Sequence, residues 1–130
     1  MYTRGRRGEC VGRARSVGGG AGEAKRGREW FAKRRLGNGR ACHVNAGMSE
    51  QSWHGEVGPP MDGVADRYSE AELRGIVANS KSVFGEQTIM PAFYSMKVGV
   101  RVADKFAGKT ILSAQQVEDI VAYLMTLKEQ

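Results

Sequence analysis

The residues of this chain best suited to chemistry are Cys42 and His43, which are adjacent in the sequence. When a second cysteine lies three positions upstream, such a pair completes the pattern C-x-x-C-H. In that pattern two thiols add to the vinyl groups of a haem and the imidazole binds the iron. Here the upstream position is Gly39. The sequence therefore predicts a haem-attachment site that lacks one of its two anchors.

Haem iron in a low-spin state needs a second axial ligand from the opposite face, and a thioether can supply it. Met48 is too close to His43 in the sequence to reach across a haem, and Met125 is expected in a helical core. Met90 precedes a proline that stiffens its loop, and it has apolar neighbours that could pack on a haem. We favour Met90, with Met96 second, among the candidates Met48, Met61, Met90, Met96 and Met125.

Other interpretations of these residues stay open at this point. A methionine in an apolar loop is usually a core residue. We interpret Trp53 as a packing residue and His54 as a surface imidazole, with a second iron ligand as the lesser alternative for His54. A zinc site is less well supported, because an adjacent Cys and His seldom reach one tetrahedral ion together. Cys10 is separated from Cys42 by a Gly/Arg-rich span, so we do not expect a disulfide.

The first 22 residues differ from the rest in composition: they are rich in Gly and Arg and nearly free of large apolar side chains. Such a stretch buries too little surface to offset its ordering entropy, and we predict that residues 1–22 are disordered. Residues 1–40 carry 12 Lys/Arg against 3 Asp/Glu, whereas residues 41–130 carry 8 against 11. A basic arm could touch nucleic acid or an anionic membrane, but the expected role is a solvated tail. We see no signal peptide and expect no membrane span.

The remaining chain, residues 23–130, reads as one all-α domain of about three helices and two long loops. A helix is expected over residues 22–35, with Gly27 on its apolar face, where a close second helix would explain the glycine. Residues 36–39 then end this helix, with Gly supplying the turn. Residues 44–68, rich in Gly and Pro, form a long loop, and residues 81–112 form a second connector, with a possible short helix over residues 92–98.

Two capping boxes predict the other helix starts. Ser69 with Glu72 begins a helix that closes at Asn79 or Ser80, and Ser113 with Gln116 begins the C-terminal helix. In the first, we predict the apolar stripe Leu73, Ile76 and Val77. In the second, we predict that Val117, Ile120, Val121, Leu124 and Leu127 share the buried face, flanked by Tyr123, while Glu118, Asp119 and Lys128 face outward.

These elements together resemble a known family. From residue 22 to residue 130 the chain is similar to small class I cytochromes c, and more narrowly to SoxX, the monohaem subunit of the SoxXA cytochromes of bacterial sulfur oxidation. Each segment alone is modest support, but their order is specific. The resemblance rests on residues 27–31 (GREWF), 35–38 (RLGN), 41–44 (ACHV), 58–65 (GPPMDGVA), 88–94 (TIMPAFY) and 112–124 (LSAQQVEDIVAYL).

The resemblance implies a class I cytochrome c fold of three to five helices around a haem crevice, with Gly27 opposite Tyr123 where the first and last helices cross. It implies one haem c, held by a single thioether through Cys42 because position 39 is Gly. It also implies that His43 is the proximal iron ligand and that Met90 is the distal one. A carbonyl in the turn after Gly58, that of Pro59, would accept a hydrogen bond from the second ring nitrogen of the histidine.

The resemblance also implies a role. A SoxA-like subunit, in a heterodimer with this chain, would join thiosulfate to a cysteine of a SoxYZ-type carrier. This chain would pass the electrons to a soluble cytochrome acceptor in the periplasm. It would thus be the electron-transfer subunit of an L-cysteine S-thiosulfotransferase-type complex, without catalytic residues of its own and without a nucleic-acid partner. The alternative is a degenerate, haem-poor helical module that only pairs with the SoxA-like partner.

Overall fold

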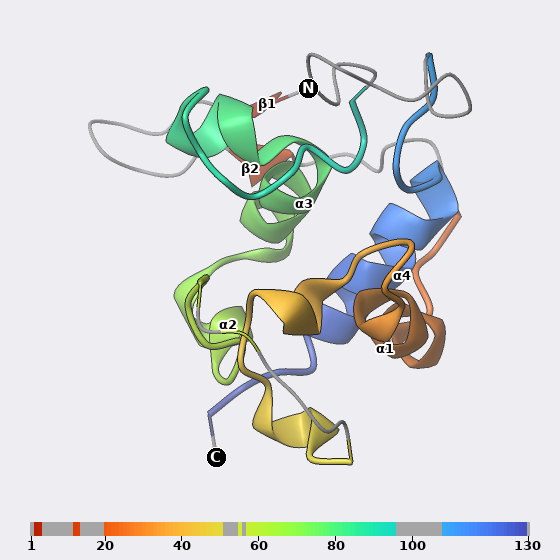
Figure 1. Ribbon diagram of the computed structural model, residues 1–130, viewed down its shortest axis with the longest axis vertical. Coiled ribbons are helices and arrows are strands. Elements are labelled where there is room, and N and C mark those ends of the chain that lie inside the picture. The colour runs from red at the N-terminus through yellow and green to blue at the C-terminus, as the bar shows by residue number, and fades with distance from the viewer. Residues whose placement is uncertain are drawn as a thin grey trace.

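The computed structural model describes residues 2–3, 12–13, 20–50, 55, 57–95 and 108–129. Two-residue strands β1 (Tyr2–Thr3) and β2 (Gly12–Arg13) pair antiparallel. Otherwise the described elements are helical: α1 (Ala24–Ala32), the 3₁₀ turns η1 (Gly39–Ala41) and η2 (Ala46–Met48), α2 (Val64–Arg67), α3 (Glu70–Phe84) and α4 (Ala114–Leu124). Figure 1 shows α1 and α4 lying against each other, with α3 above them in this view; α3 also contacts α4. No helix in this described part is long and apolar enough to cross a bilayer.

The contact between α1 and α4 depends on Gly27. A Cβ atom at Gly27 would lie 1.9 Å from the carbonyl oxygen of Asp119 and 2.8 Å from the Cβ of Tyr123, so only a glycine permits this approach. One turn further along α1, the buried ring of Phe31 meets the ring of Tyr123 edge-on, with their centroids 5.9 Å apart. The expected placement of Gly27 opposite Tyr123 is confirmed.

The first helix is shorter than expected, because it ends at Ala32 rather than at residue 35. The following turn reverses through Asn38, which has the left-handed φ of +47° and donates its backbone N–H to the carbonyl of Lys33 at 3.0 Å. The sequence predicted that a glycine of residues 36–39 supplies this turn, whereas its left-handed residue is Asn38. Asparagine tolerates this conformation better than other residues with a side chain, so the same turn forms without a glycine at that place.

Both predicted capping boxes are present, with Ser69 and Ser113 as the N-caps of α3 and α4. The helical backbone breaks at Asn79 (φ −154°, ψ 80°), where the sequence predicted the helix to close, but a second helical stretch follows and α3 runs on to Phe84. The side-chain oxygen of Asn79 accepts the Ser82 N–H at 3.3 Å, so a side chain replaces a backbone acceptor at the break. The chain therefore bends at Asn79 and then resumes the helix.

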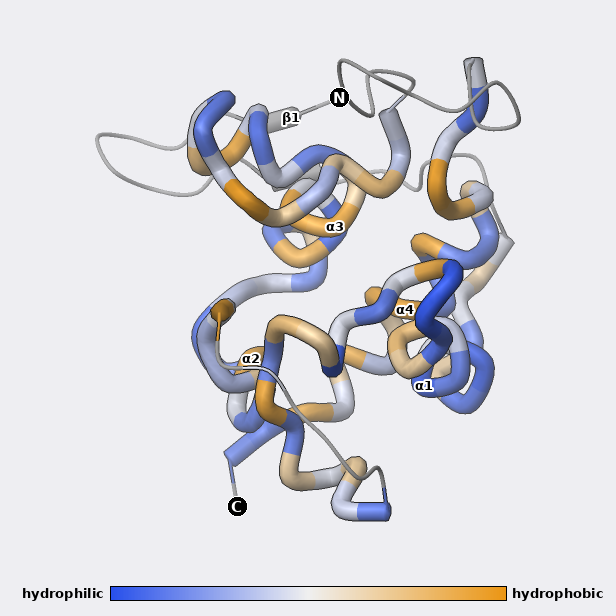
Figure 2. The backbone as a smooth tube through the Cα atoms, in the orientation of Figure 1, coloured by the Kyte–Doolittle hydropathy of each residue, from blue (hydrophilic) through white to orange (hydrophobic). Residues whose placement is uncertain are grey.

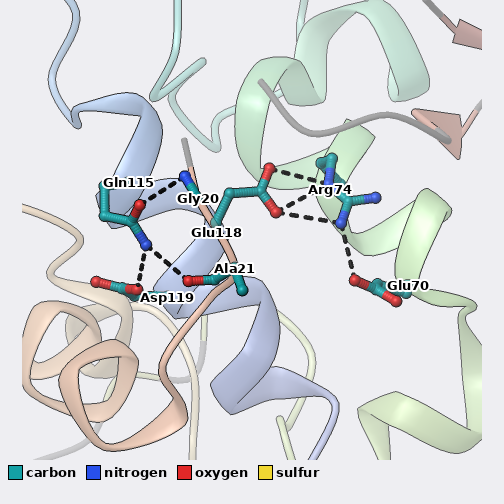
Figure 3. A network of polar contacts seen from close by, with 7 residues as sticks. All are labelled: Gly20, Ala21, Glu70, Arg74, Gln115, Glu118 and Asp119. Atoms are coloured by element: carbon teal, nitrogen blue, oxygen red, sulfur yellow. Dashed lines mark hydrogen bonds and ion pairs between the residues drawn. The ribbon is translucent and has the colours of Figure 1, made fainter. Parts of the chain in front are cut away.

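The predicted apolar stripes are buried except for Leu127, which is half-buried and lies beyond the end of α4. Figure 2 shows hydrophobic and hydrophilic positions along α3. The outward placement of Glu118 and Asp119 was wrong, because they are only 5% and 1% exposed. The carboxylate of Glu118 accepts hydrogen bonds from the buried guanidinium of Arg74 on α3, at 3.0 Å from Nε (Figure 3). Helical periodicity cannot predict the burial of Glu118, because this carboxylate can be buried only where a cation on another helix pairs with it.

Asp119 is buried for a different reason. Its carboxylate accepts the Glu23 backbone N–H at 2.9 Å and the Trp30 indole N–H at 3.1 Å, so it ties the start of α1 to α4. On α4, the side chain of Gln115 binds two residues that precede α1. Its amide oxygen accepts the Gly20 N–H, and its amide nitrogen donates to the carbonyl of Ala21 (Figure 3). The residues immediately preceding α1 therefore run along α4.

The predicted loop over residues 44–68 contains two short helices, η2 and α2, so it is more structured than expected. Asn45 begins η2 by accepting the Gly47 N–H with its side chain at 3.1 Å. Gly63, with φ of +72°, precedes α2. Trp53, His54 and Met96 lie outside the described residues, as do residues 97 and 98. The described part of the short helix expected over residues 92–98, residues 92–95, forms a turn and not a helix.

Candidate haem site

His43 lies directly after the single turn η1, which the turn at Asn38 introduces. The carbonyl of Gly39 accepts the backbone N–H groups of Cys42 at 3.1 Å and of His43 at 2.8 Å. These two bonds fix the backbone that carries the thiol and the imidazole. Cys42 is half-buried and its thiol is free. The pair therefore stands on a compact turn at the C-terminal end of α1.

The ring of His43 is held by the loop that follows it. Its Nδ1 lies 2.7 Å from the carbonyl oxygen of Pro59. Because a carbonyl only accepts hydrogen bonds, this contact requires the proton on Nδ1 and leaves the lone pair on Nε2. A histidine in this tautomer, with its ring orientation fixed by a second partner, is the form that binds a metal.

Gly58 makes room for this imidazole. A Cβ atom at Gly58 would lie 2.2 Å from Cε1 and 2.5 Å from Nδ1 of His43, so the ring rests on bare backbone. The Gly58 N–H also donates to the carbonyl of Cys42 at 2.7 Å. Gly55 repeats the arrangement: its N–H donates to Arg40 at 2.8 Å, and a Cβ there would lie 1.7 Å from the carbonyl of Ala41. Gly55, Gly58 and Pro59 therefore lie against residues 40–43. The contacts that they make with the imidazole of His43 fit a metal-binding histidine.

Met90 lies on a different part of the fold, in the loop after α3 (Figure 1). The hydroxyl of Ser80 donates to the carbonyl of Met90 at 2.6 Å and lies 3.2 Å from that of Pro91. Lys81 also donates to the carbonyl of Thr88. Met90 is half-buried, and its neighbour Ile89 is 80% exposed. The segment before Pro91 is thus anchored to the second half of α3 through its backbone.

The bend at Asn79 explains how this loop docks. Because the helix is interrupted there, the carbonyls of Val77 and Ala78 are available to partners outside the helix. They accept the N–H groups of Phe93 at 3.3 Å and of Tyr94 at 2.9 Å. The sequence predicted that the helix closes at Asn79 or Ser80, but it did not predict that these residues dock the loop that contains Met90. The available signal was an Asn-Ser pair inside a helical pattern, since both side chains compete for backbone partners.

The other methionines of the described chain have core positions. Met48 is fully buried and Met61 is 7% exposed, and both belong to the hydrophobic core, against which Met125 packs. A depression of about 570 Å³ lies elsewhere, lined by Asp62, Gly63 and residues 126–129 among others, and not by Cys42, His43 or Met90. Within the described residues, no three His, Cys, Asp or Glu side chains are grouped so that they could hold a metal ion.

Comparisons with known proteins show which family the chain is similar to. The family model for cytochrome c matches residues 24–128. The crystal structure of SoxXA from P. pantotrophus contains a chain that is 44% identical, with a TM-score of 0.81; the match covers 92% of this chain and 90% of that one. No curated protein sequence matches.

The chain therefore belongs to the cytochrome c family. Within that family it is of the SoxX type: an electron-transfer subunit related to SoxX of SoxXA, with covalently bound haem c as its cofactor. The predicted all-α class I cytochrome c fold is confirmed. The assignments of individual residues to the haem stay predictions.

Proposed function

We propose that this chain accepts electrons from a SoxA-like partner that joins thiosulfate to a SoxYZ-type carrier, and that it passes them to a soluble cytochrome in the periplasm. The observation that supports this best is the 2.7 Å contact between His43 Nδ1 and the carbonyl of Pro59, which prepares Nε2 for an iron. The likeness to SoxXA supports the heterodimer. In this role the chain is the electron-transfer subunit of an L-cysteine S-thiosulfotransferase-type complex.

In the proposed site, His43 and Met90 are the axial ligands and Cys42 forms the one thioether. Bound haem supplies a one-electron couple, and an imidazole paired with a thioether favours its reduced form. Pro59 orients the ring of His43 and increases its basicity through Nδ1. Gly58 keeps the ring in contact with the backbone. Ser80 and Lys81 hold the loop that presents Met90.

The domain division that goes with this proposal places the cytochrome c domain at residues 23–130 and a basic arm at residues 1–22. The family match over residues 24–128 is consistent with the boundary. The arm contributes none of the side chains proposed for the haem site. Deleting residues 1–19 should therefore leave the visible spectrum of the loaded protein unchanged.

The test of the haem assignments is a spectrum of the full chain, exported behind a working leader together with the haem-attachment machinery. We expect a Soret band, an intact mass increased by one haem, and a reduced pyridine adduct that absorbs between the two-thioether and no-thioether positions. Met90→Leu should change the spin state. Met61→Leu, at a buried core methionine, is the matched control and should change only stability. A haem that extracts fully into acid and organic solvent would contradict attachment through Cys42.

The electron path needs its own experiment. Reduced carrier, thiosulfate and the partner subunit are mixed with the oxidised cytochrome, and its haem should be reduced only when all three are present. A soluble cytochrome acceptor added afterwards should reoxidise it. Reduction that proceeds without the SoxA-like subunit would overturn the proposed order of transfer.

The glycine at position 39 supports a second candidate function for this chain, that of a haem-poor interaction module that pairs with the SoxA-like partner. With one cysteine missing from the attachment pattern, the attachment machinery could leave the chain unloaded. The distinguishing result is a folded chain that forms the heterodimer but carries no Soret band when it is exported.

A further inference from the structure

Gly39 occupies the place of the missing cysteine, and its backbone conformation does not require a glycine. The glycines with positive φ in the described chain are Gly63, Gly85 and Gly108, and Gly39 is not among them. Any L-residue could therefore adopt the backbone of position 39. A different reason must exclude a side chain there, and it lies in the surroundings of this residue.

The obstacle is the ring of Phe31. A Cβ atom at Gly39 would lie 2.2 Å from Cε2, 2.4 Å from Cζ and 2.6 Å from Cδ2 of that ring. Carbon atoms that are not bonded to each other sit about 3.5–4.0 Å apart, so the overlap is about 0.9 Å or more at each of these atoms. The collision involves the Cβ atom itself, so alanine and cysteine at position 39 meet it equally.

Neither partner in this collision can move away easily. The Gly39 carbonyl accepts two hydrogen bonds, from Cys42 and His43, which fix its backbone. The Phe31 ring is 5% exposed and meets the ring of Tyr123 edge-on. The hydroxyl of Tyr123 is in turn fixed by the buried Asn45 amide, which donates to it at 2.7 Å. Displacing Phe31 would therefore disturb a packed chain of buried groups.

We propose that Phe31 and Gly39 form a complementary pair in which the aromatic ring fills the space that a second cysteine side chain needs, so that this site is built for attachment through Cys42 alone. This rests on the proposed haem function of Cys42. Attachment adds the Sγ–H of Cys42 across a vinyl C=C bond. One S–C bond forms, the π bond is lost, and the thiol proton moves to the neighbouring vinyl carbon, so no oxidant is needed.

The first consequence is that restoring the cysteine alone does not restore the second anchor. In the full chain, Gly39→Ala and Gly39→Cys should each lower the melting temperature by about 5–10 °C, because both introduce the same Cβ. Phe31→Ala should by itself lower the melting temperature. When the same substitutions are added to Phe31→Ala, they should lower the melting temperature by less than about 2 °C more. Gly47→Ala is the control: a Cβ there meets only the Asn45 amide oxygen, at 3.2 Å, and the shift should stay within about 2 °C in both backgrounds.

The second consequence concerns the haem. After export with the attachment machinery, Gly39→Cys should still give the single-thioether pyridine spectrum and keep one thiol at residues 39 and 42 that iodoacetamide can modify, besides that of Cys10. The double variant Phe31→Ala/Gly39→Cys should give the two-thioether spectrum and no modifiable thiol at residues 39 and 42. The chemical count of thiols by mass separates the two variants even if both bind haem with similar affinity.

The outcomes distinguish this inference from the proposed function. Additive shifts in melting temperature, or Gly39→Ala melting within about 2 °C of the natural chain, would overturn the pairing of Phe31 with Gly39. A two-thioether spectrum from Gly39→Cys alone would overturn it as well. If the natural chain carries no covalent haem but the melting temperatures couple as expected, the proposed function fails and the steric pairing stands.

Discussion

Adding one methyl group at Gly58 should disrupt the histidine cradle. In Gly58→Ala the new Cβ would lie 2.2 Å from Cε1, 2.5 Å from Nδ1 and 2.9 Å from Nε2 of His43. An ordinary carbon–carbon contact is about 3.5 Å or more, so the ring must retreat by roughly 1.3 Å or rotate. Gly58 has no positive φ, and so the backbone can accept alanine without strain.

The magnitude follows from what the retreat breaks. The His43 Nδ1 contact with Pro59 is 2.7 Å long, and a shift of about 1.3 Å lengthens it beyond hydrogen-bonding range. Losing that bond costs about 0.5–1.5 kcal/mol, and forcing a methyl group into a packed contact costs about 1–3 kcal/mol. We therefore expect Gly58→Ala to lower the free energy of unfolding by about 2–4 kcal/mol. A lost outer partner of a metal-binding histidine typically weakens metal binding by about 10–100-fold.

Two assays read this out. Urea unfolding of the haem-free chain measures the stability term, and competition for haem by a stronger acceptor protein measures how tightly the loaded chain retains its cofactor. Val57→Ala is the matched control on the adjacent residue, which is 68% exposed, and it should change stability by less than about 0.5 kcal/mol. If Gly58→Ala unfolds like Val57→Ala and keeps the natural haem spectrum, the imidazole is not held as described here.

Three further predictions concern the helices that frame the site. Gly27→Ala should lower the free energy of unfolding by about 3 kcal/mol in urea titrations, because its Cβ would lie 1.9 Å from the carbonyl of Asp119; a change below about 0.5 kcal/mol would contradict the close helix crossing. Arg74→Met should lower the free energy of unfolding by about 3–5 kcal/mol, because it removes the cation from the buried Glu118 carboxylate. Arg74→Met combined with Glu118→Leu should recover most of this stability. Equal losses of stability in the two variants would argue against the ion pair. Burial would raise the pKa of Asp119, but hydrogen bonds from Gln115, the Glu23 backbone and Trp30 outweigh it and lower that pKa below its ordinary value. A carboxyl group with a lowered pKa adds stability above its unfolded pKa of about 3.9, and that stability is lost as the pH falls through the lower folded value. Asp119→Asn should therefore flatten the acid limb of the stability profile below about pH 4, and an unchanged limb would refute this account.

Local sequence signals predicted the parts of this protein that depend on neighbours along the chain. The capping boxes at Ser69 and Ser113 set the starts of α3 and α4, because each cap is made by side chains three residues apart. The apolar stripe beginning at Val117 identified the buried face of α4. Cys42 and His43 predicted a haem-attachment site that lacks one anchor, and membership of the cytochrome c family implies covalently bound haem c.

The resemblance extended those signals to distant pairs. It predicted Gly27 opposite Tyr123, which the structure confirms, and it predicted the Pro59 carbonyl as the partner of His43, which the structure places 2.7 Å from Nδ1. Neither pair could be found from periodicity, because each joins positions far apart in the chain. Met90 as the distal ligand remains a prediction.

Only the tertiary structure decided the features that depend on a second element. Glu118 and Asp119 looked like solvent-facing positions by their charge, and they are buried because Arg74 on α3 and the N–H groups at the start of α1 meet them. α3 bends at Asn79, and the carbonyls of Val77 and Ala78 before the bend accept the backbone N–H groups of Phe93 and Tyr94. From the sequence, Gly39 is a position where the attachment pattern has a cysteine. The tertiary structure shows that the ring of Phe31 occupies the space that a side chain at position 39 would need. A sequence records which groups must find partners, whereas the packing of helices determines which partners they find.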